Sequence, residues 1–303
     1  MPSIKQSTIK LGLIQLQAGN DMRANTERAY ALAQMAAKKG AHILCLPELY
    51  NTVYFPQLEK ADKDYYAETV PGFSTATFCA LAKKYKVVVI VPLYEKKKVN
   101  GIWKYFNSAV VINEKGQILD TYHKIHIPHD PGFYEKYYFE ESKSGYRVYK
   151  TSYATFAVLI CYDQWFPEAA RAARLNGAEI IFYPTAIGNV VGYAPPEGDW
   201  HASWELMMRS HAIANCVHVA AVNRVGREER MRFWGQSFVS DAFGTVVDRA
   251  TSSKEQVLIV PVNLGMNHYI EDGWGFLRNR RPDTYGMLTS KKLIEKSKKL
   301  KNI

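Results

Sequence analysis

A carboxylate, a lysine and a cysteine each stand at the end of an apolar run that is typical of a β-strand. Glu48 follows the run AHILCLP at 41–47, Lys124 follows a strand expected near 118–122, and Cys161 ends the run YATFAVLIC at 153–161. α/β proteins build their sites at the carboxyl ends of strands. A carboxylate can serve as a base, a cysteine as a nucleophile and a lysine as a partner for an oxyanion, so the set suits attack by a thiol.

The segment VLICYDQWFPE at 158–168 predicts a strand, a turn and then a helix that begins near Pro167. We expect Cys161 to be exposed at this turn. The helix dipole and the free backbone N–H groups of a helix N-terminus stabilise negative charge, which favours a thiolate. The other cysteines, Cys45, Cys79 and Cys216, form no C-x-x-C pair and are interpreted as structural, reduced thiols.

Each of these features alone has a plainer interpretation. Glu48 would also suit an exposed acid at a strand end, and Lys124 a surface lysine. The histidines at 123, 126 and 129 suggest a metal site, but Pro128 breaks any helical face and their spacing matches no recognised ligand pattern. The sequence contains no G-x-S-x-G, G-x-G-x-x-G or G-K-[ST] motif. We therefore expect no metal and no organic cofactor.

Apolar, β-branched runs alternate with helical patterns, which predicts one α/β domain built in layers. Most runs lack polar–apolar alternation, so their strands should be covered on both faces. Helices are expected to begin at the caps Asn25 and Ser74 and at Pro167, with a fourth over 204–215. Strands are expected at 9–17, 41–49, 87–95, 105–113, 153–163, 178–186, 217–225, 237–242 and 257–264.

The composition favours a folded protein that acts without a membrane. Hydrophobic residues make up 47% and charged residues 22% of the 303 residues, which excludes global disorder. No apolar run is long enough to span a bilayer, and no secretory signal is recognised, so a cytoplasmic location is expected.

The net charge is +10, of which the tail 290–303 supplies +5 through six lysines and one glutamate. We expect a single domain over 1–289 followed by this basic C-terminal tail. The rest of the chain has no arginine-rich stripe, so neither nucleic acid nor a membrane is expected as a partner. A binding protein that uses its basic surface and no catalysis remains a distant alternative.

Four motifs in order, LPEL (46–49), YHKIHIP (122–128), ICYDQWFPE (160–168) and NRVG (223–226), resemble the nitrilase, or carbon–nitrogen hydrolase, superfamily. The resemblance covers roughly residues 8–286. It implies a four-layer α-β-β-α sandwich, a homo-oligomer, and a catalytic triad of Glu48, Lys124 and Cys161. Within the superfamily the chain is most similar to the N-carbamoylputrescine amidases, through Tyr54-Phe55, GFYEKYYF (132–139) and PTAIG (184–188), and it departs from their pattern over 189–203.

This resemblance implies a reaction. Cys161 would attack the ureido carbonyl of a small N-carbamoyl amine, Glu48 would transfer protons, and Lys124 with a backbone N–H near Tyr162 would stabilise the oxyanion. Glu135 matches the family's second glutamate, and the alternative interpretation is that it forms a salt bridge with Lys136 or another surface base. A β-ureidopropionase, another N-carbamoyl amino acid amidohydrolase or an aliphatic amidase of the same superfamily is the alternative function.

Six residues are candidates for substrate binding under the same resemblance. Two acids in the divergent loop could pair with a distal ammonium group, or they could be solvated loop charges. The candidates are Tyr54, Trp165, Thr185, Ala186, Glu197 and Asp199.

Overall fold

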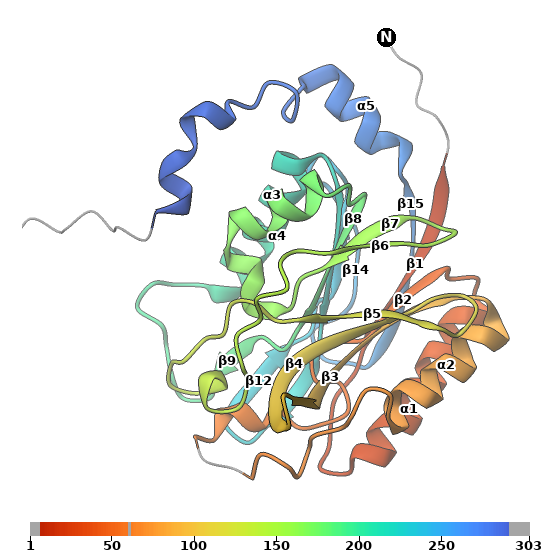
Figure 1. The fold of residues 1–303 in the computed structure, drawn as a ribbon, viewed down its shortest axis with the longest axis vertical. Coiled ribbons are helices and arrows are strands. Elements are labelled where there is room, and N and C mark those ends of the chain that lie inside the picture. Colours follow the sequence, from red (N-terminus) through yellow and green to blue (C-terminus); the bar gives the residue numbers. More distant parts are fainter. Residues whose placement is uncertain (1–6, 60–61, 291–303) are drawn as a thin grey trace, which may run out of the picture.

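Two six-stranded sheets form the centre of the molecule in a computed structural model that describes residues 7–59 and 62–290 (Figure 1). The first sheet has the order β15-β1-β2-β3-β4-β5 and the second the order β14-β13-β10-β8-β7-β6. A smaller sheet has the order β11-β12-β9. The expected basic tail lies, apart from Ser290, outside the described residues, so the boundary at 289 stays a prediction.

The strands have these bounds: β1 Thr8–Gln15, β2 Ile43–Cys45, β3 Val88–Val99, β4 Ile102–Ile112, β5 Ile118–His123, β6 Val148–Lys150, β7 Thr155–Val158, β8 Ile180–Thr185, β9 Gly188–Val190, β10 His218–Asn223, β11 Val225–Glu228, β12 Met231–Trp234, β13 Phe238–Ser240, β14 Val246–Arg249 and β15 Gln256–Asn263. The α-helices are α1 Met22–Lys38, α2 Phe73–Tyr85, α3 Pro167–Leu175, α4 Trp200–Asn215 and α5 Gly265–Trp274. Short 3-10 helices occupy Phe55–Gln57, Glu135–Tyr137, Cys161–Trp165, Pro282–Thr284 and Gly286–Thr289.

The two large sheets pack face to face, and helices cover their outer faces. In β3, Val88 and Ile90 belong to the apolar core shared with the second sheet, whereas Val89 and Val91 pack with the buried residues of α1 and α2. The α3 and α4 helices pack against the second sheet. Strands with two buried faces need no polar alternation, which confirms the sequence prediction. The α-β-β-α sandwich is confirmed as well.

Three helix starts differ from the sequence prediction. The carboxylate of Asp21 accepts the backbone N–H groups of Arg23 and Ala24, so α1 begins at Met22, and Asn25 instead bonds the backbone of Gly19. Aspartate and asparagine are both good helix caps. Here Asp21 accepts the free N–H groups of the first turn, and therefore the helix begins after Asp21.

The second helix follows Gly72, and Ser74 lies inside its first turn, where Glu68 accepts both its N–H and its hydroxyl. The fourth helix begins at Trp200, four residues before its expected start, because Asp199 caps it. Four short strands, β6, β9, β11 and β12, together with β14 and α5, were not expected from the sequence.

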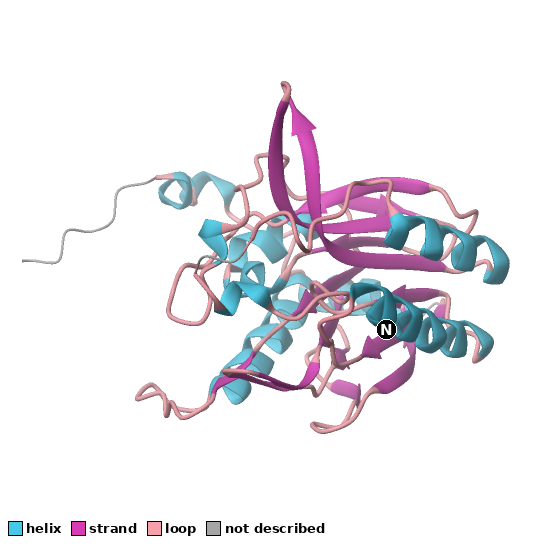
Figure 2. Ribbon diagram, turned by 90° about the horizontal axis from the view of Figure 1, so that it is seen from below, coloured by secondary structure: helices cyan, strands magenta, loops and turns pink. Residues whose placement is uncertain are grey.

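The hairpin of β3 and β4 projects beyond the rest of its sheet (Figure 2). It reverses through Asn100 and Gly101, both with positive φ. Among the described residues, no helix combines the length and the apolar character that a bilayer span requires.

Gly12 of β1 faces α1 at a place where no side chain fits. A Cβ atom there would lie 2.5 Å from Leu44 Cδ2, 3.1 Å from Ala41 Cβ and 3.3 Å from Ala36 Cβ of α1. We expect Gly12→Val to lower the free energy of unfolding by about 1–3 kcal/mol, because the added methyl groups overpack the contact between helix and sheet. Urea unfolding measures this loss. Gly286→Ala is the control, since a Cβ there meets no atom within 4 Å. Equal stability of the two variants would contradict this account of the α1 contact.

Candidate active site

Glu48 lies in a tight turn just beyond β2, and a buried arginine holds the backbone of that turn. Leu49 has a φ of 50°, in the left-handed region. Arg224 follows β10 and donates to the carbonyl oxygens of Glu48 and Leu49, each at 2.8 Å, and of Thr52 at 3.2 Å. The NRVG motif thus fixes the position of the glutamate, a role that the sequence did not indicate.

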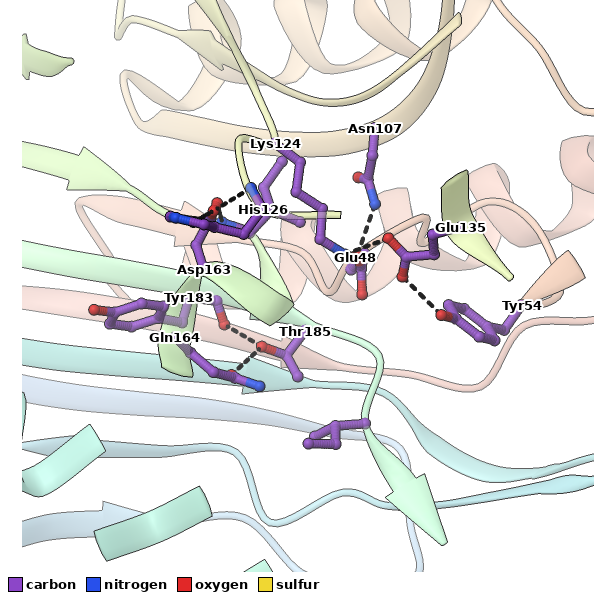
Figure 3. A network of polar contacts seen from close by, with 12 residues as sticks. Glu48, Tyr54, Asn107, Lys124, His126, Glu135, Asp163, Gln164, Tyr183 and Thr185 are labelled. Atoms are coloured by element: carbon purple, nitrogen blue, oxygen red, sulfur yellow. Dashed lines mark hydrogen bonds and ion pairs between the residues drawn. The ribbon is translucent and has the colours of Figure 1, made fainter. Parts of the chain in front are cut away.

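Lys124 follows β5 directly and lies between two carboxylates (Figure 3). Its Nζ donates to Glu48 Oε1 at 2.8 Å and to Glu135 Oε2 at 2.6 Å, and all three side chains are 0% exposed. Burial lowers the pKa of Lys124, but the charges of Glu135 and Glu48 outweigh it and hold that pKa above its ordinary value. Burial raises the pKa of Glu135 to about 7, against the opposing effect of Lys124. Lys124 is therefore a permanent cation in this site.

Two further donors orient the carboxylates. Asn107 Nδ2 donates to Glu48 Oε1 at 2.7 Å, and the Tyr54 hydroxyl donates to Glu135 Oε1 at 2.7 Å. The carbonyl of Asn107 also accepts the backbone N–H of Lys124. Among the described residues, Glu48 Oε2 has no hydrogen-bond partner. The sequence analysis missed Asn107, although an amide within an apolar strand is a usable signal.

Cys161 begins the turn after β7, as expected, but it is buried rather than exposed. It is 7% exposed, its φ is 43°, and α3 starts only at Pro167. Burial raises the pKa of the Cys161 thiol well above its usual range, and the charge of Glu48 raises it further, against Lys124 and the backbone N–H of Ala186. The expected thiolate is therefore wrong for the resting site. Desolvation and the nearby carboxylate of Glu48 both disfavour the thiolate.

A cavity of about 600 Å³ opens beside Cys161 and Glu135. Five aromatic residues lie in its walls, and two more acids, Asp130 and Glu197, lie along it. Glu197 accepts a hydrogen bond from Trp200 Nε1 at 2.7 Å. The lining residues are Pro128, Asp130, Pro131, Phe133, Glu135, Cys161, Tyr162, Trp165, Ile187, Val190, Tyr193, Glu197, Trp200 and Ser203.

Of the six expected substrate-binding residues, Trp165 and Glu197 line the cavity. Tyr54 contacts Glu135 instead. The hydroxyl of Thr185 donates to Gln164 Oε1 and to a backbone carbonyl, and the carboxylate of Asp199 accepts the first N–H groups of α4. Ala186 presents its backbone N–H to Cys161.

The three histidines around Lys124 face separate partners. His123 pairs with Glu95, His126 pairs with Asp163, and His129 lies beside Tyr134. Within residues 7–59 and 62–290, no group of three or more His, Cys, Asp or Glu side chains is arranged to hold a metal ion.

The neighbours of Glu135 distinguish between a carboxylate that contacts Lys124 and one that forms a salt bridge with Lys136. Glu135 contacts Lys124 and Tyr54, whereas Lys136 pairs with Glu141. The arrangement therefore gathers two carboxylates and a cation near a thiol that lines the cavity, which suits nucleophilic attack on a carbonyl carbon.

Comparisons with known proteins agree with this geometry. The family model described as carbon-nitrogen hydrolase matches residues 10–267. An N-carbamoylputrescine amidase from Solanum lycopersicum is 38% identical over 296 residues, which cover 94% of this chain and 96% of that protein. A citrullinase from Francisella tularensis is 34% identical, over 94% of this chain and 99% of its own.

A solved structure of a carbon-nitrogen hydrolase from Helicobacter pylori superposes with a TM-score of 0.88 and is 36% identical, covering 94% of this chain and 100% of that one. The family model spans most of the chain, and the relatives match over nearly their full lengths. The protein described here therefore belongs to the carbon–nitrogen hydrolase family, within the nitrilase superfamily.

Proposed function

We propose that this hydrolase cleaves N-carbamoyl amines and that its preferred substrate is N-carbamoylputrescine, which yields putrescine, carbon dioxide and ammonia. The observation that carries the proposal is the charge of the cavity. Its described lining includes the acids Asp130, Glu135 and Glu197 and neither lysine nor arginine. An ammonium group buried without an anionic partner is costly, so acids along the cavity favour a cationic substrate. The N-carbamoylputrescine amidases among the relatives support the same choice.

In the proposed reaction, Glu48 Oε2 takes the thiol proton of Cys161 while the sulfur attacks the ureido carbon. Lys124 and a backbone N–H near Tyr162 stabilise the oxyanion of the tetrahedral intermediate. Glu48 then passes its proton to the departing nitrogen, and the C–N bond breaks. Ammonia departs, and the carbamoyl group remains bound to the sulfur.

Water completes the cycle. Glu48 removes a proton from water as the oxygen attacks the S-carbamoyl carbon, and the proton returns to the sulfur as the C–S bond breaks. The released carbamate decomposes to carbon dioxide and the free amine. Glu135 keeps Lys124 in place and, from the cavity wall, helps to position the substrate or the water. No step requires a cofactor or a metal.

Hydrolysis of an N-carbamoyl amino acid is the alternative. Its carboxylate would call for a cation in the cavity. Assembly into a homo-oligomer and a cytoplasmic location stay predictions from the sequence.

The substrate class is tested by ammonia release from a matched panel. We expect N-carbamoylputrescine to be preferred over neutral N-carbamoylbutylamine, and both over N-carbamoyl-β-alanine.

Cys161→Ser should lower kcat at least about a thousandfold, because an alkoxide forms far less readily than a thiolate. Cys79→Ser, a change at a half-buried cysteine in α2, is the control and should retain turnover. A fully active Cys161→Ser variant would contradict the assignment of Cys161 as the nucleophile. In the substrate panel, preference for N-carbamoyl-β-alanine would establish the alternative function.

The charge of Glu48 gives a prediction with a definite sign. Because that charge raises the pKa of Cys161, Glu48→Gln should shift the midpoint of Cys161 alkylation by iodoacetamide to lower pH. Turnover should fall in the same variant, because the base is gone. Mass spectrometry of the Cys161 peptide across a pH series measures the midpoint. Glu68→Gln, which removes a carboxylate that caps α2, should leave it unchanged. A midpoint that stays or rises in Glu48→Gln would show that Glu48 does not act on the thiol.

The two acids of the loop before α4 form a matched pair for testing the distal ammonium site. Glu197 lines the cavity, whereas Asp199 caps the helix. We expect Glu197→Gln to raise KM for N-carbamoylputrescine about tenfold, equivalent to about 1.4 kcal/mol, and to leave N-carbamoylbutylamine unchanged. Asp199→Asn should alter neither value, since asparagine also caps helices. Equal effects of Glu197→Gln on both substrates would mean that this carboxylate does not pair with the ammonium group.

A further inference from the structure

Asp163 is a fully buried carboxylate that does not line the cavity, although it lies two residues after Cys161. Its Oδ2 accepts the hydroxyl of Tyr122 at 2.8 Å and the backbone N–H of Ile160 at 3.0 Å. Its Oδ1 accepts the backbone N–H of His126 at 3.0 Å and the ring Nδ1–H of the same residue at 2.7 Å. Both oxygens are thus occupied by two donors each.

Two residues that donate to Asp163, namely Tyr122 and His126, lie on either side of Lys124 in the sequence. Tyr122 stands two residues before Lys124, and His126 stands two residues after it. Figure 3 shows His126 and Asp163 side by side near Lys124. β5 ends at His123, and the backbone N–H of Lys124 still donates to the Asn107 carbonyl of β4 at 2.9 Å. The ring of His126 also stacks on Phe166, with centroids 3.7 Å apart and an angle of 7° between the planes. The segment that carries Lys124 is therefore fastened to the segment that carries Cys161.

The remaining donor acts on the nucleophile's own turn. Ile160 donates its N–H to the Asp163 side chain, and Asp163 returns its N–H to the Ile160 carbonyl at 3.0 Å. These two bonds close around Cys161, whose φ of 43° is unfavourable for a residue with a side chain. Such a conformation persists only where the surroundings enforce it.

We propose that Asp163 is a positioning residue that sets Cys161 and Lys124 at their working separation by holding both segments through one carboxylate. This inference rests on the proposed roles of Cys161 and Lys124. Asp163 acts through its neighbours and touches no reacting atom. A carboxylate is required because only it offers two acceptor oxygens; the amide of asparagine would turn an NH₂ group toward two of the four donors.

Two tyrosines provide a matched test. Tyr122 and Tyr50 are both 0% exposed, and each hydroxyl donates one hydrogen bond of 2.8 Å, to Asp163 and to Ser74 respectively. The changes Tyr122→Phe and Tyr50→Phe therefore remove the same group from equally buried sites. We expect Tyr122→Phe to lower kcat about tenfold with KM unchanged, by the same factor for cationic and neutral substrates, because misplaced reacting groups slow the chemical step. Tyr50→Phe should lose similar thermal stability and keep its kcat.

Asp163→Asn should lower kcat about a hundredfold or more in the folded protein. If that variant does not fold, the tyrosine pair decides the question. The inference is overturned if Tyr122→Phe keeps its kcat as Tyr50→Phe does, or if folded Asp163→Asn turns over at nearly the normal rate. Failure of the proposed function is distinct, since it would appear as activity in Cys161→Ser whatever the tyrosine variants do.

Discussion

The burial of one lysine between two carboxylates is the constraint on which the rest of this structure depends. Removing three ionised groups from water is costly, and the cost is recovered only when their geometry and their hydrogen bonds are nearly complete. Lys124 reaches Glu48 and Glu135, and Asn107 and Tyr54 supply the further donors. Burial, followed by the charge of Glu48, raises the pKa of the neighbouring Cys161 thiol well above its usual range.

The layered fold brings these groups together from two different sheets. Glu48 and Lys124 follow β2 and β5 of the first sheet, whereas Cys161 follows β7 of the second. Contacts that cross between the layers therefore determine how these three residues lie relative to one another. Arg224, which follows β10, holds the glutamate's turn, and the bonds of Asp163 tie β5 to the turn after β7.

The sequence predicted much of this architecture, and its failures have physical causes. The nine strand ranges and the triad positions were found because long buried runs and residues at their ends are local signals. The cap of α1 was misplaced because Asp21 and Asn25 are equally good caps, and tertiary contacts decide between them. The thiolate was wrong because desolvation and the charge of Glu48 come from segments far along the chain. The sequence also did not indicate the roles of Asn107, Asp163 and Arg224, because the groups that they contact are distant in sequence.

The left-handed backbone at Cys161 sets stability and catalysis against each other at a single position. A residue with a side chain costs roughly 1–2 kcal/mol in that conformation, whereas glycine adopts it freely. Glycine at this position would remove that cost, but it would also remove the sulfur that we propose as the nucleophile. Under that proposal, the φ of 43° at Cys161 means that part of the thermodynamic margin of the fold is given up to keep the sulfur in place.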